Sequence, residues 1–188
     1  SIAYEICRDA WVEDRPLKDF EDVQVVLNPS ASHFAFNRHK ERQELVLSSA
    51  KKFAVHYLYS NLLGNEAGRI IYDGCTFIAS PTGELVSGPR FLFDNFSITS
   101  SIVEIERREN PNALKIPFSI IETEGQKKQE VAAWESSKFL KEEEFTRAVS
   151  LGLYDYLRKS RSDAFVLSLS GGADSAAVAC LVYFMSKL

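Results

Sequence analysis

The chain has 188 residues, of which 45% are hydrophobic and 26% are charged, and its formal net charge at pH 7 is -4. This length suits one domain or parts of two, and the composition is typical of a globular protein. The acidic balance excludes a basic surface for DNA or RNA, and no apolar run is long enough to span a membrane. The opening letters, SIAYEICRDAW, do not form a signal peptide and resemble the interior of a domain, so we expect further residues before Ser1.

The first 112 residues predict a strand-rich fold with one clear helix. Apolar and aromatic runs bounded by Asn, Pro and Gly are typical of strands and hairpins. The helix is indicated by Val46, Ala50 and Phe53, which recur at helical spacing. The expected elements are strands at 22–30, 55–61 and 97–108, a helix at 38–54 and a hairpin at 74–88.

After residue 112 the composition changes. Residues 113–142 are rich in Glu and Lys and are predicted to form a charged connector. Residues 143–160 are amphipathic, with Phe145, Val149 and Leu153 on one face, and predict a helix. A short apolar strand at 163–169 and an alanine-rich, buried helix from residue 173 are expected next. Helix, strand, glycine-rich turn and helix are the opening unit of a doubly wound α/β domain.

The turn between the last two elements has the composition of an anion site. Gly171 and Gly172 allow backbone N–H groups to approach a phosphate, and the helix that follows directs its positive end toward it. Ser170 and Ser175 add hydroxyl donors, while Asp174 is suited to hold a magnesium ion that the phosphates share. The turn has no lysine and fits neither the Walker A nor the dinucleotide fingerprint.

The letters SGGADS, Ser170 to Ser175, resemble the Ser-Gly-Gly-x-Asp-Ser loop of N-type ATP pyrophosphatases, with every fixed position present. The resemblance implies that ATP is cleaved between its α and β phosphates, that the loop binds pyrophosphate and that Asp174 binds Mg²⁺. The alternative is a chance glycine-rich turn. The implied ATP-binding residues are Ser168, Leu169, Ser170, Gly171, Gly172, Ala173, Asp174 and Ser175.

Cys7 lies after a short apolar segment and beside charged residues. A lone cysteine is most often a buried apolar residue. Here, however, the letters EICRDAW resemble the nucleophile turn of the nitrilase superfamily, and the later letters NPSASHFAFNRHKER, YSNLLG and YDGCTFIASPTGELV resemble its following segments in order. The resemblance implies that Cys7 is the catalytic nucleophile of an αββα sandwich. The Glu base and the Lys of that superfamily precede the cysteine and have no matching position in this chain.

The two resemblances occur together in glutamine-dependent NAD synthetases, and the chain resembles an internal fragment of one. This implies a partial nitrilase-like glutaminase domain at 1–112 and the start of the synthetase domain at 143–188. Glutamine would release ammonia, which would displace AMP from adenylated deamido-NAD. In this family Ser32 and Arg38 match the positions that hold the α-amino and α-carboxylate ends of glutamine, although Arg38 could also be a surface arginine at a helix start. We further expect a cytoplasmic homo-oligomer.

Two other functions remain open from the sequence. A different amidating ligase with the same loop, similar to GMP synthetase or asparagine synthetase, would carry an unrelated glutaminase module. An inactive interaction module would use neither site. The histidines and the other two cysteines, Cys75 and Cys180, are expected to be packing or surface residues, because their spacing fits no metal motif.

Overall fold

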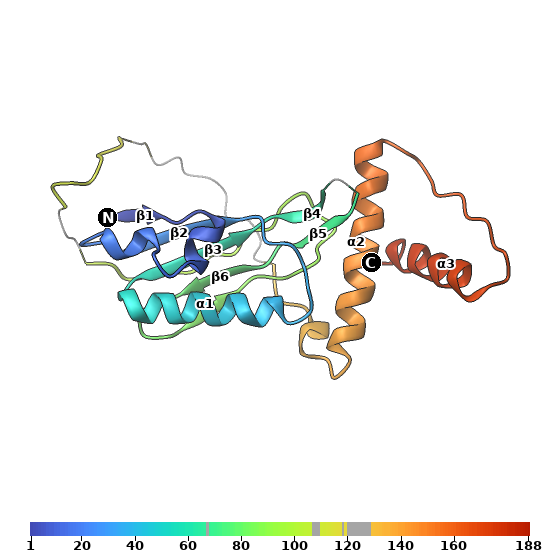
Figure 1. The fold of residues 1–188 in the computed structure, drawn as a ribbon, viewed down its shortest axis with the longest axis horizontal. Coiled ribbons are helices and arrows are strands. Elements are labelled where there is room, and N and C mark those ends of the chain that lie inside the picture. The colour runs from blue at the N-terminus through green and yellow to red at the C-terminus, as the bar shows by residue number, and fades with distance from the viewer. Residues whose placement is uncertain (67, 107–109, 118, 120–128) are drawn as a thin grey trace.

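The computed structural model describes residues 1–66, 68–106, 110–117, 119 and 129–188. Its centre is a mixed five-stranded sheet in the order β1-β2-β3-β6-β7, in which β1, β2 and β3 are parallel and β6 and β7 are antiparallel. Figure 1 shows helix α1 along one face of this sheet. The strands are β1 (Ile2–Tyr4), β2 (Val25–Ser30), β3 (His56–Asn61), β6 (Thr76–Ala79) and β7 (Leu85–Ser87).

Helix α1 (Arg38–Phe53) covers the sheet because one side of it is apolar. Val46 and Ala50 are fully buried, and they pack against the inward residues of β3 and β6, among them Tyr57 and Phe77. The aromatic residues of these strands therefore form part of the hydrophobic core. The predictions of β2, α1, β3 and the β6–β7 hairpin are all confirmed, and so is the mixed α/β class.

A second, two-stranded sheet was not predicted. Strands β4 (Leu63–Glu66) and β5 (Ile70–Asp73) pair antiparallel and extend from the end of the main sheet (Figure 1). Helix α2 (Leu140–Ser160) packs across this pair. Gly64 has a φ of 115°, and a Cβ on it would lie 2.8 Å from an oxygen of Asp155, so the close approach of strand and helix requires glycine here.

Polar contacts hold α2 to the first part of the chain. The carboxylate of Asp155 accepts a hydrogen bond of 2.7 Å from the backbone N–H of Asn65. Arg90 is 3% exposed and bonds Glu144 of α2 and Glu135 of the short helix η3 (Ala133–Ser136), both at 2.7 Å. Its guanidinium also lies 5.1 Å from the ring centre of Trp134. The charged connector therefore ends in ordered, docked structure.

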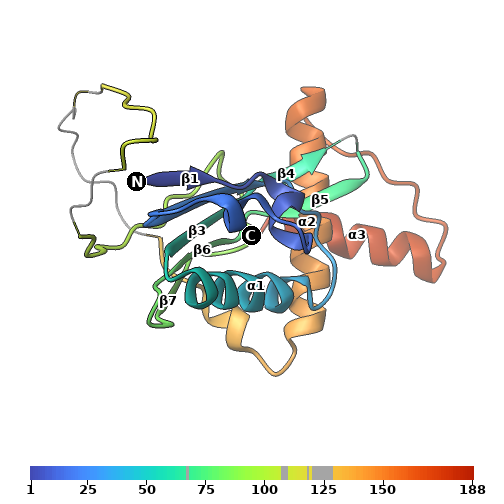
Figure 2. The same cartoon turned by 60° about the vertical axis from the view of Figure 1, so that its left-hand side comes forward.

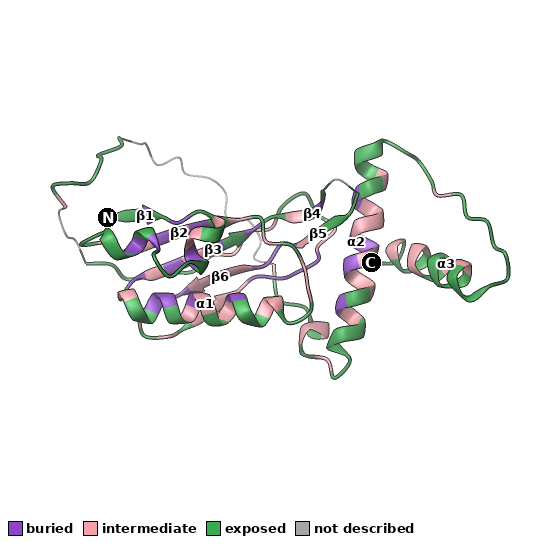
Figure 3. Ribbon diagram, in the orientation of Figure 1, coloured by how far each residue is buried: buried purple, intermediate pink, exposed green. Residues whose placement is uncertain are grey.

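The face of α2 that packs on the first part of the chain differs from the predicted face. Figure 3 shows buried stretches along α2. The buried residues are Glu144, Ala148, Ser150, Leu151 and Asp155, whereas Phe145 is 51% exposed. The buried side is smaller and more polar because it fits closely onto β4 and β5. The helix also begins at Leu140, three residues before the predicted start.

Two predicted strands are not formed in the described residues. Residues 97–106 run without strand structure, and positions 107 and 108 of that prediction lie outside the described residues. Residues 163–169 are also irregular, and Val166 is 98% exposed. A strand needs a partner for its backbone groups, and no described segment pairs with either stretch.

The last helix, α3 (Ala173–Met185), packs against α2 and none of its residues is buried. Figure 2 shows it on the outer side of α2, away from the main sheet. The prediction of a buried helix is therefore wrong in this chain, because α2 covers only one side of α3. Within the described residues, no helix combines the length and apolar character needed to cross a membrane.

Candidate functional site

The carboxyl ends of β1, β2 and β3 meet at one edge of the main sheet, because these strands are parallel. Cys7 follows β1, Ser32 follows β2 and Asn61 is the last residue of β3. In open α/β sheets, ligands bind at such an edge. The fold therefore places two residues that the sequence predicts for a glutamine site, Cys7 and Ser32, after neighbouring strands.

Cys7 occupies a sharp turn between a strand and a helix. It has a φ of 50°, is half-buried and begins the short helix η1 (Cys7–Trp11). The turn is fixed by a 3.0 Å hydrogen bond from the backbone N–H of Ile6 to the carboxylate of Asp9. A positive φ at a non-glycine residue is costly and is common where a turn presents a nucleophile. The alternative of a fully packed core cysteine does not hold for Cys7.

A buried ion pair anchors the strand before Cys7. Glu5 is fully buried, and its carboxylate accepts hydrogen bonds of 2.8 Å from Arg15 Nε and of 2.8 Å from the Tyr57 hydroxyl. Arg15 also donates to Ser49 of α1 at 2.9 Å. Because this carboxylate is already paired with a guanidinium, Glu5 is not suited to be the base that activates Cys7.

Arg38 is the first residue of α1 and approaches the helix that Cys7 begins. Its guanidinium lies 5.8 Å from the ring centre of Trp11, the last residue of η1. It also pairs with Glu41 at 2.8 Å, and its side chain is 36% exposed. The structure thus brings Arg38 to the same end of the sheet as Cys7, while its role in binding glutamine stays a prediction.

A buried network behind Ser32 was missed by the sequence analysis. Arg42 is fully buried and donates 2.8 Å hydrogen bonds to both carboxylate oxygens of Asp73 and to the backbone carbonyl of Ser32. Asn61 binds the same Asp73 carboxylate at 2.8 Å. One signal could have revealed it: Arg42 lies one helical turn before Val46, on the apolar side of α1, where a charged residue needs a buried partner.

Within the described residues, one group has the donor set of a metal site: His39, Asp73 and Cys75, whose ligand atoms lie within 4.8 Å of one another. Arg42 Nη1 already donates to Asp73 and, at 3.3 Å, to Cys75 Sγ. Burial, followed by the charge of Asp73, raises the pKa of Cys75 to about 12, so its thiol stays protonated. The Arg42 guanidinium occupies the place where a metal would bind, and a neutral thiol is a poor metal ligand. We therefore interpret this cluster as a structural one and not as a metal site.

His39 gives the fold a dependence on pH. Burial first, and then the charge of Arg90, lower the pKa of His39 from 6.5 to about 4. Between these values the unfolded chain binds a proton that the folded chain does not, so the free energy of unfolding falls as the pH falls from about 6.5 to about 4. The expected slope is up to about 1.4 kcal/mol per pH unit.

His39→Gln should remove this slope, as measured by chemical denaturation at a series of pH values. The exposed His33 provides the matched control, because His33→Gln should leave the slope of the parent protein in place. Equal slopes for His39→Gln and the parent would show that His39 does not cause the acid sensitivity.

The C-terminal turn has a backbone suited to an anion. Gly171 has a φ of 83° and no atom lies within 4 Å of the position a Cβ would take, so the loop requires glycine and is open there. Gly172 is the N-cap of α3 and provides no side-chain cap, which leaves the first N–H groups of the helix without a side-chain acceptor. Ser175 Oγ lies 3.2 Å from Ser170 Oγ, and both residues flank the glycines.

The other residues of the predicted ATP loop lie in the same stretch. Asp174 is in the first turn of α3 and is exposed, as are Ser168, Leu169 and Ala173. A carboxylate at this place is compatible with Mg²⁺, which prefers oxygen ligands and retains several waters. The loop and helix parts of the predicted strand–loop–helix unit are present, whereas the strand is not.

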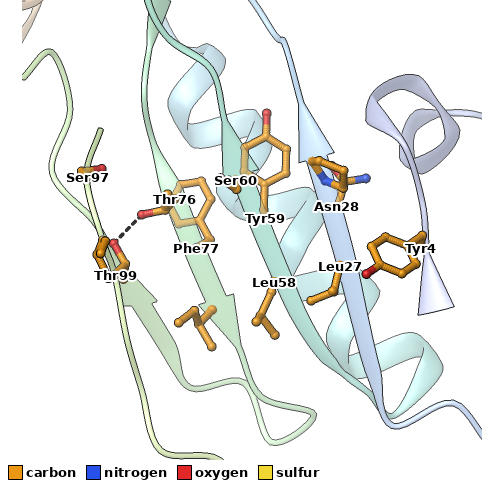
Figure 4. A pocket seen from close by; sticks show the side chains of 13 residues that line it. Tyr4, Leu27, Asn28, Leu58, Tyr59, Ser60, Thr76, Phe77, Ser97 and Thr99 are labelled. Atoms are coloured by element: carbon orange, nitrogen blue, oxygen red, sulfur yellow. Dashed lines mark hydrogen bonds between the residues drawn. The ribbon is translucent and has the colours of Figure 1, made fainter. Parts of the chain in front are cut away.

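The main sheet also has a hollow on the face away from α1. It has a volume of about 410 Å³ and includes the outward residues Leu27, Leu58 and Ile78. Figure 4 shows Leu27 and Leu58 in front of the sheet, with the hydroxyls of Thr76 and Thr99 bonded to each other at one side. Neither Cys7, Ser32 nor Arg38 lines this hollow, so it is separate from the candidate site.

The comparisons with curated proteins and with solved structures both match the chain to glutamine-dependent NAD(+) synthetases. No family model matches the chain. Among curated proteins, the glutamine-dependent NAD(+) synthetases of Macaca fascicularis and Homo sapiens are each 30% identical over 203 residues, which is 98% of this chain and 29% of the relative. The enzyme of Saccharomyces cerevisiae is 27% identical over 215 residues. The chain thus spans about three tenths of the length of these relatives.

Solved structures give the same result. The glutamine-dependent NAD(+) synthetase of Cytophaga hutchinsonii matches with a TM-score of 0.69 and 40% identity, over 98% of this chain and 25% of that one. The Acinetobacter baumannii enzyme, solved with ADP, matches with a TM-score of 0.63 at 20% identity and over 95% of this chain and 30% of that one, which supports the fold alone. Nearly every residue of this chain is therefore aligned with a part of these proteins, and the chain is a homologue of the glutamine-dependent NAD(+) synthetases.

Proposed function

We propose that the protein containing this chain converts deamido-NAD to NAD, using ATP and ammonia released from glutamine. The observation that carries the proposal is the turn at Cys7, where a half-buried thiol on a residue with a positive φ follows a parallel strand. This turn lies in a chain that aligns along almost its whole length with glutamine-dependent NAD(+) synthetases. The activity belongs to the whole protein, of which this chain supplies parts of two sites.

In the glutaminase half, Cys7 is the nucleophile. Its sulfur forms a bond to the amide carbon of glutamine and the C–N bond breaks. The nitrogen leaves as ammonia once it has received the thiol proton, and water then cleaves the thioester to give glutamate. The thiolate, and not the thiol, is the nucleophile, so the step needs a base that takes the thiol proton. The family resemblance assigns that task to a Glu assisted by a Lys, for which this chain has no matching residues.

Two side chains of this chain, Arg38 and Ser32, would bind glutamine and orient it toward the thiol. Arg38 can pair with the carboxylate of glutamine through two parallel hydrogen bonds, and its contact with Trp11 holds it near the helix of Cys7. Ser32 lies after the neighbouring strand and offers a hydroxyl. Both residues approach the carboxyl edge of the sheet, where the thiol lies.

In the synthetase half, residues 168–175 hold the phosphates of ATP. The first N–H groups of α3 donate to phosphate oxygens. The hydroxyls of Ser170 and Ser175 can do the same once they turn away from each other and from the Gly172 carbonyl, to which Ser175 donates at 3.0 Å. Asp174 would hold Mg²⁺, which neutralises phosphate charge when bound. The carboxylate of deamido-NAD then attacks the α-phosphate, pyrophosphate leaves, and ammonia displaces AMP from the adenylate. The ADP in the Acinetobacter homologue supports a nucleotide site in such proteins.

A substrate screen of the full-length protein tests the proposal. ATP, deamido-NAD and glutamine together should yield AMP, pyrophosphate, glutamate and NAD in equal amounts, and ammonium should replace glutamine. AMP formation that requires another acceptor in place of deamido-NAD would show a different amidating ligase, and no AMP formation with any acceptor would favour an interaction module. The same protein provides a test of the expected homo-oligomer by light scattering.

A further inference from the structure

Ser32 is held by two side chains that were not assigned to any site by the sequence. Asn61 accepts a 2.8 Å hydrogen bond from the Ser32 backbone N–H and donates one of 2.9 Å to its carbonyl. Arg42 donates to the same carbonyl at 2.8 Å and to the Ser32 hydroxyl oxygen at 3.2 Å. Ser32 is thus fixed at its N–H, its carbonyl and its side chain.

The two holding side chains are themselves fixed by Asp73. Arg42 and Asp73 are fully buried, Asn61 is 8% exposed, and both Arg42 and Asn61 bond the Asp73 carboxylate at 2.8 Å. Burial is the largest single effect on Arg42 and lowers its pKa, but the charge of Asp73 and the other partners of the guanidinium together outweigh it and raise the pKa, so the guanidinium remains charged. The network joins α1 and the ends of β3 and β5 to the loop after β2.

Arg42 has no hydrogen-bond donor left for a substrate. A guanidinium has five N–H groups. The Nε atom donates to the hydroxyl of Ser32, Nη1 donates to Asp73 and Cys75, and Nη2 donates to the carbonyls of Ser32 and His33. Arg42 therefore acts on a substrate through the groups that it holds, and of these Ser32 is the one predicted for the glutamine site.

We propose that Arg42, supported by Asn61 and Asp73, is a positioning residue that sets Ser32 to donate its hydroxyl proton to the bound substrate. The inference rests on the proposed glutaminase function. Because a guanidinium has no acceptor atom, the Ser32 oxygen must accept from Arg42, and its own proton is then free to point elsewhere. A hydroxyl polarised in this way is a better donor to an anionic acceptor, such as a carboxylate oxygen of glutamine.

The test measures glutamine kinetics in the full-length protein with Arg42→Lys, Ser32→Ala and the double variant. Lysine keeps the charge beside Asp73 but lacks the fork that reaches Ser32. Arg42→Lys should raise the KM for glutamine about tenfold and change kcat much less, while ammonium-dependent synthesis stays at the parent rate. In the double variant the KM should equal that of Ser32→Ala alone, because Arg42 acts through Ser32.

Arg90→Lys is the matched control for a loss of stability, since Arg90 is also buried and paired with two carboxylates but does not contact Ser32. Its KM for glutamine should stay within twofold of the parent. If Arg42→Lys does not fold, Asn61→Ala provides the test, because it also removes hydrogen bonds that position Ser32. It should raise the KM for glutamine by a similar factor. The positioning role would be overturned if the effects of Arg42→Lys and Ser32→Ala on the KM were additive. It would also be overturned if the KM for glutamine were unchanged in Arg42→Lys, or in Asn61→Ala where Arg42→Lys does not fold. A parent protein that does not use glutamine would overturn the proposed function and this inference with it.

Discussion

Cys7→Ala should abolish NAD synthesis from glutamine and leave synthesis from ammonium at the parent rate. Removal of the nucleophile eliminates the covalent step, so the glutamine-dependent rate should fall on the order of 10³-fold or more. The ammonium-dependent rate should persist, because the predicted ATP loop at residues 168–175 does not include Cys7. The measurement is AMP formation by the full-length protein with saturating ATP and deamido-NAD and either nitrogen source.

Cys180→Ala is the matched control for this prediction, since Cys180 is an exposed cysteine of α3. It should keep both activities. Persistence of glutamine-dependent synthesis in Cys7→Ala would refute the assignment of the thiol. Loss of both activities would mean that the substitution disturbs the fold. Thermal unfolding of the variant and the parent tests this, and we expect similar curves because the substitution changes the volume of a half-buried residue only slightly.

Asp174→Ala should abolish NAD synthesis from glutamine and NAD synthesis from ammonium together. If the carboxylate holds Mg²⁺ beside the phosphates, its removal affects adenylation, which every nitrogen source requires. A loss of at least about a hundredfold is expected, which is the scale for removing one electrostatic group from a transition-state site. The release of glutamate from glutamine, measured separately, should continue.

Asp163→Ala is the matched control, because Asp163 is an exposed carboxylate just before the predicted ATP loop. It should leave the rate of AMP formation unchanged. If Asp174→Ala keeps full synthesis from ammonium, Asp174 is no metal ligand and the pyrophosphatase interpretation of the loop fails.

The elements that the sequence predicted correctly are those whose side-chain spacing matches their burial. In α1, Val46 and Ala50 lie one turn apart and both are fully buried against the sheet. The runs around Val26 and Tyr57 are apolar because these strands lie inside the sheet. Here the local pattern and the tertiary packing require the same residues, so the pattern was sufficient.

The failures come from contacts between distant segments. The buried side of α2 carries Glu144 and Asp155, because Arg90 and the N–H of Asn65 provide their partners. Those partners lie more than 50 residues away, so a rule based on hydrophobic spacing selects the opposite side, with Phe145. The segments at 97–106 and 163–169 are apolar enough for strands, but a strand also needs a neighbour, which composition cannot reveal.

The residues of the candidate site also fall into two groups, those that could be predicted from the sequence and those that could not. Cys7, Ser32 and residues 168–175 could be predicted from the sequence because short motifs carry their chemistry, and their roles stay predictions. Arg42, Asn61 and Asp73 were missed because each belongs to a different element and their contacts depend on the parallel order of β1, β2 and β3. The support of a site is three-dimensional even where its reactive residues can be recognised from the chain.

The most direct test of the central claim uses a glutamine analogue in which a diazoketone replaces the amide, a group that alkylates a thiolate and loses nitrogen. After incubation with the full-length protein, peptide mass spectrometry should find the adduct on Cys7, with glutamine-dependent synthesis lost and ammonium-dependent synthesis retained. An adduct on Cys75 or Cys180 with Cys7 unmodified, or full glutamine use after Cys7 is labelled, would contradict the account.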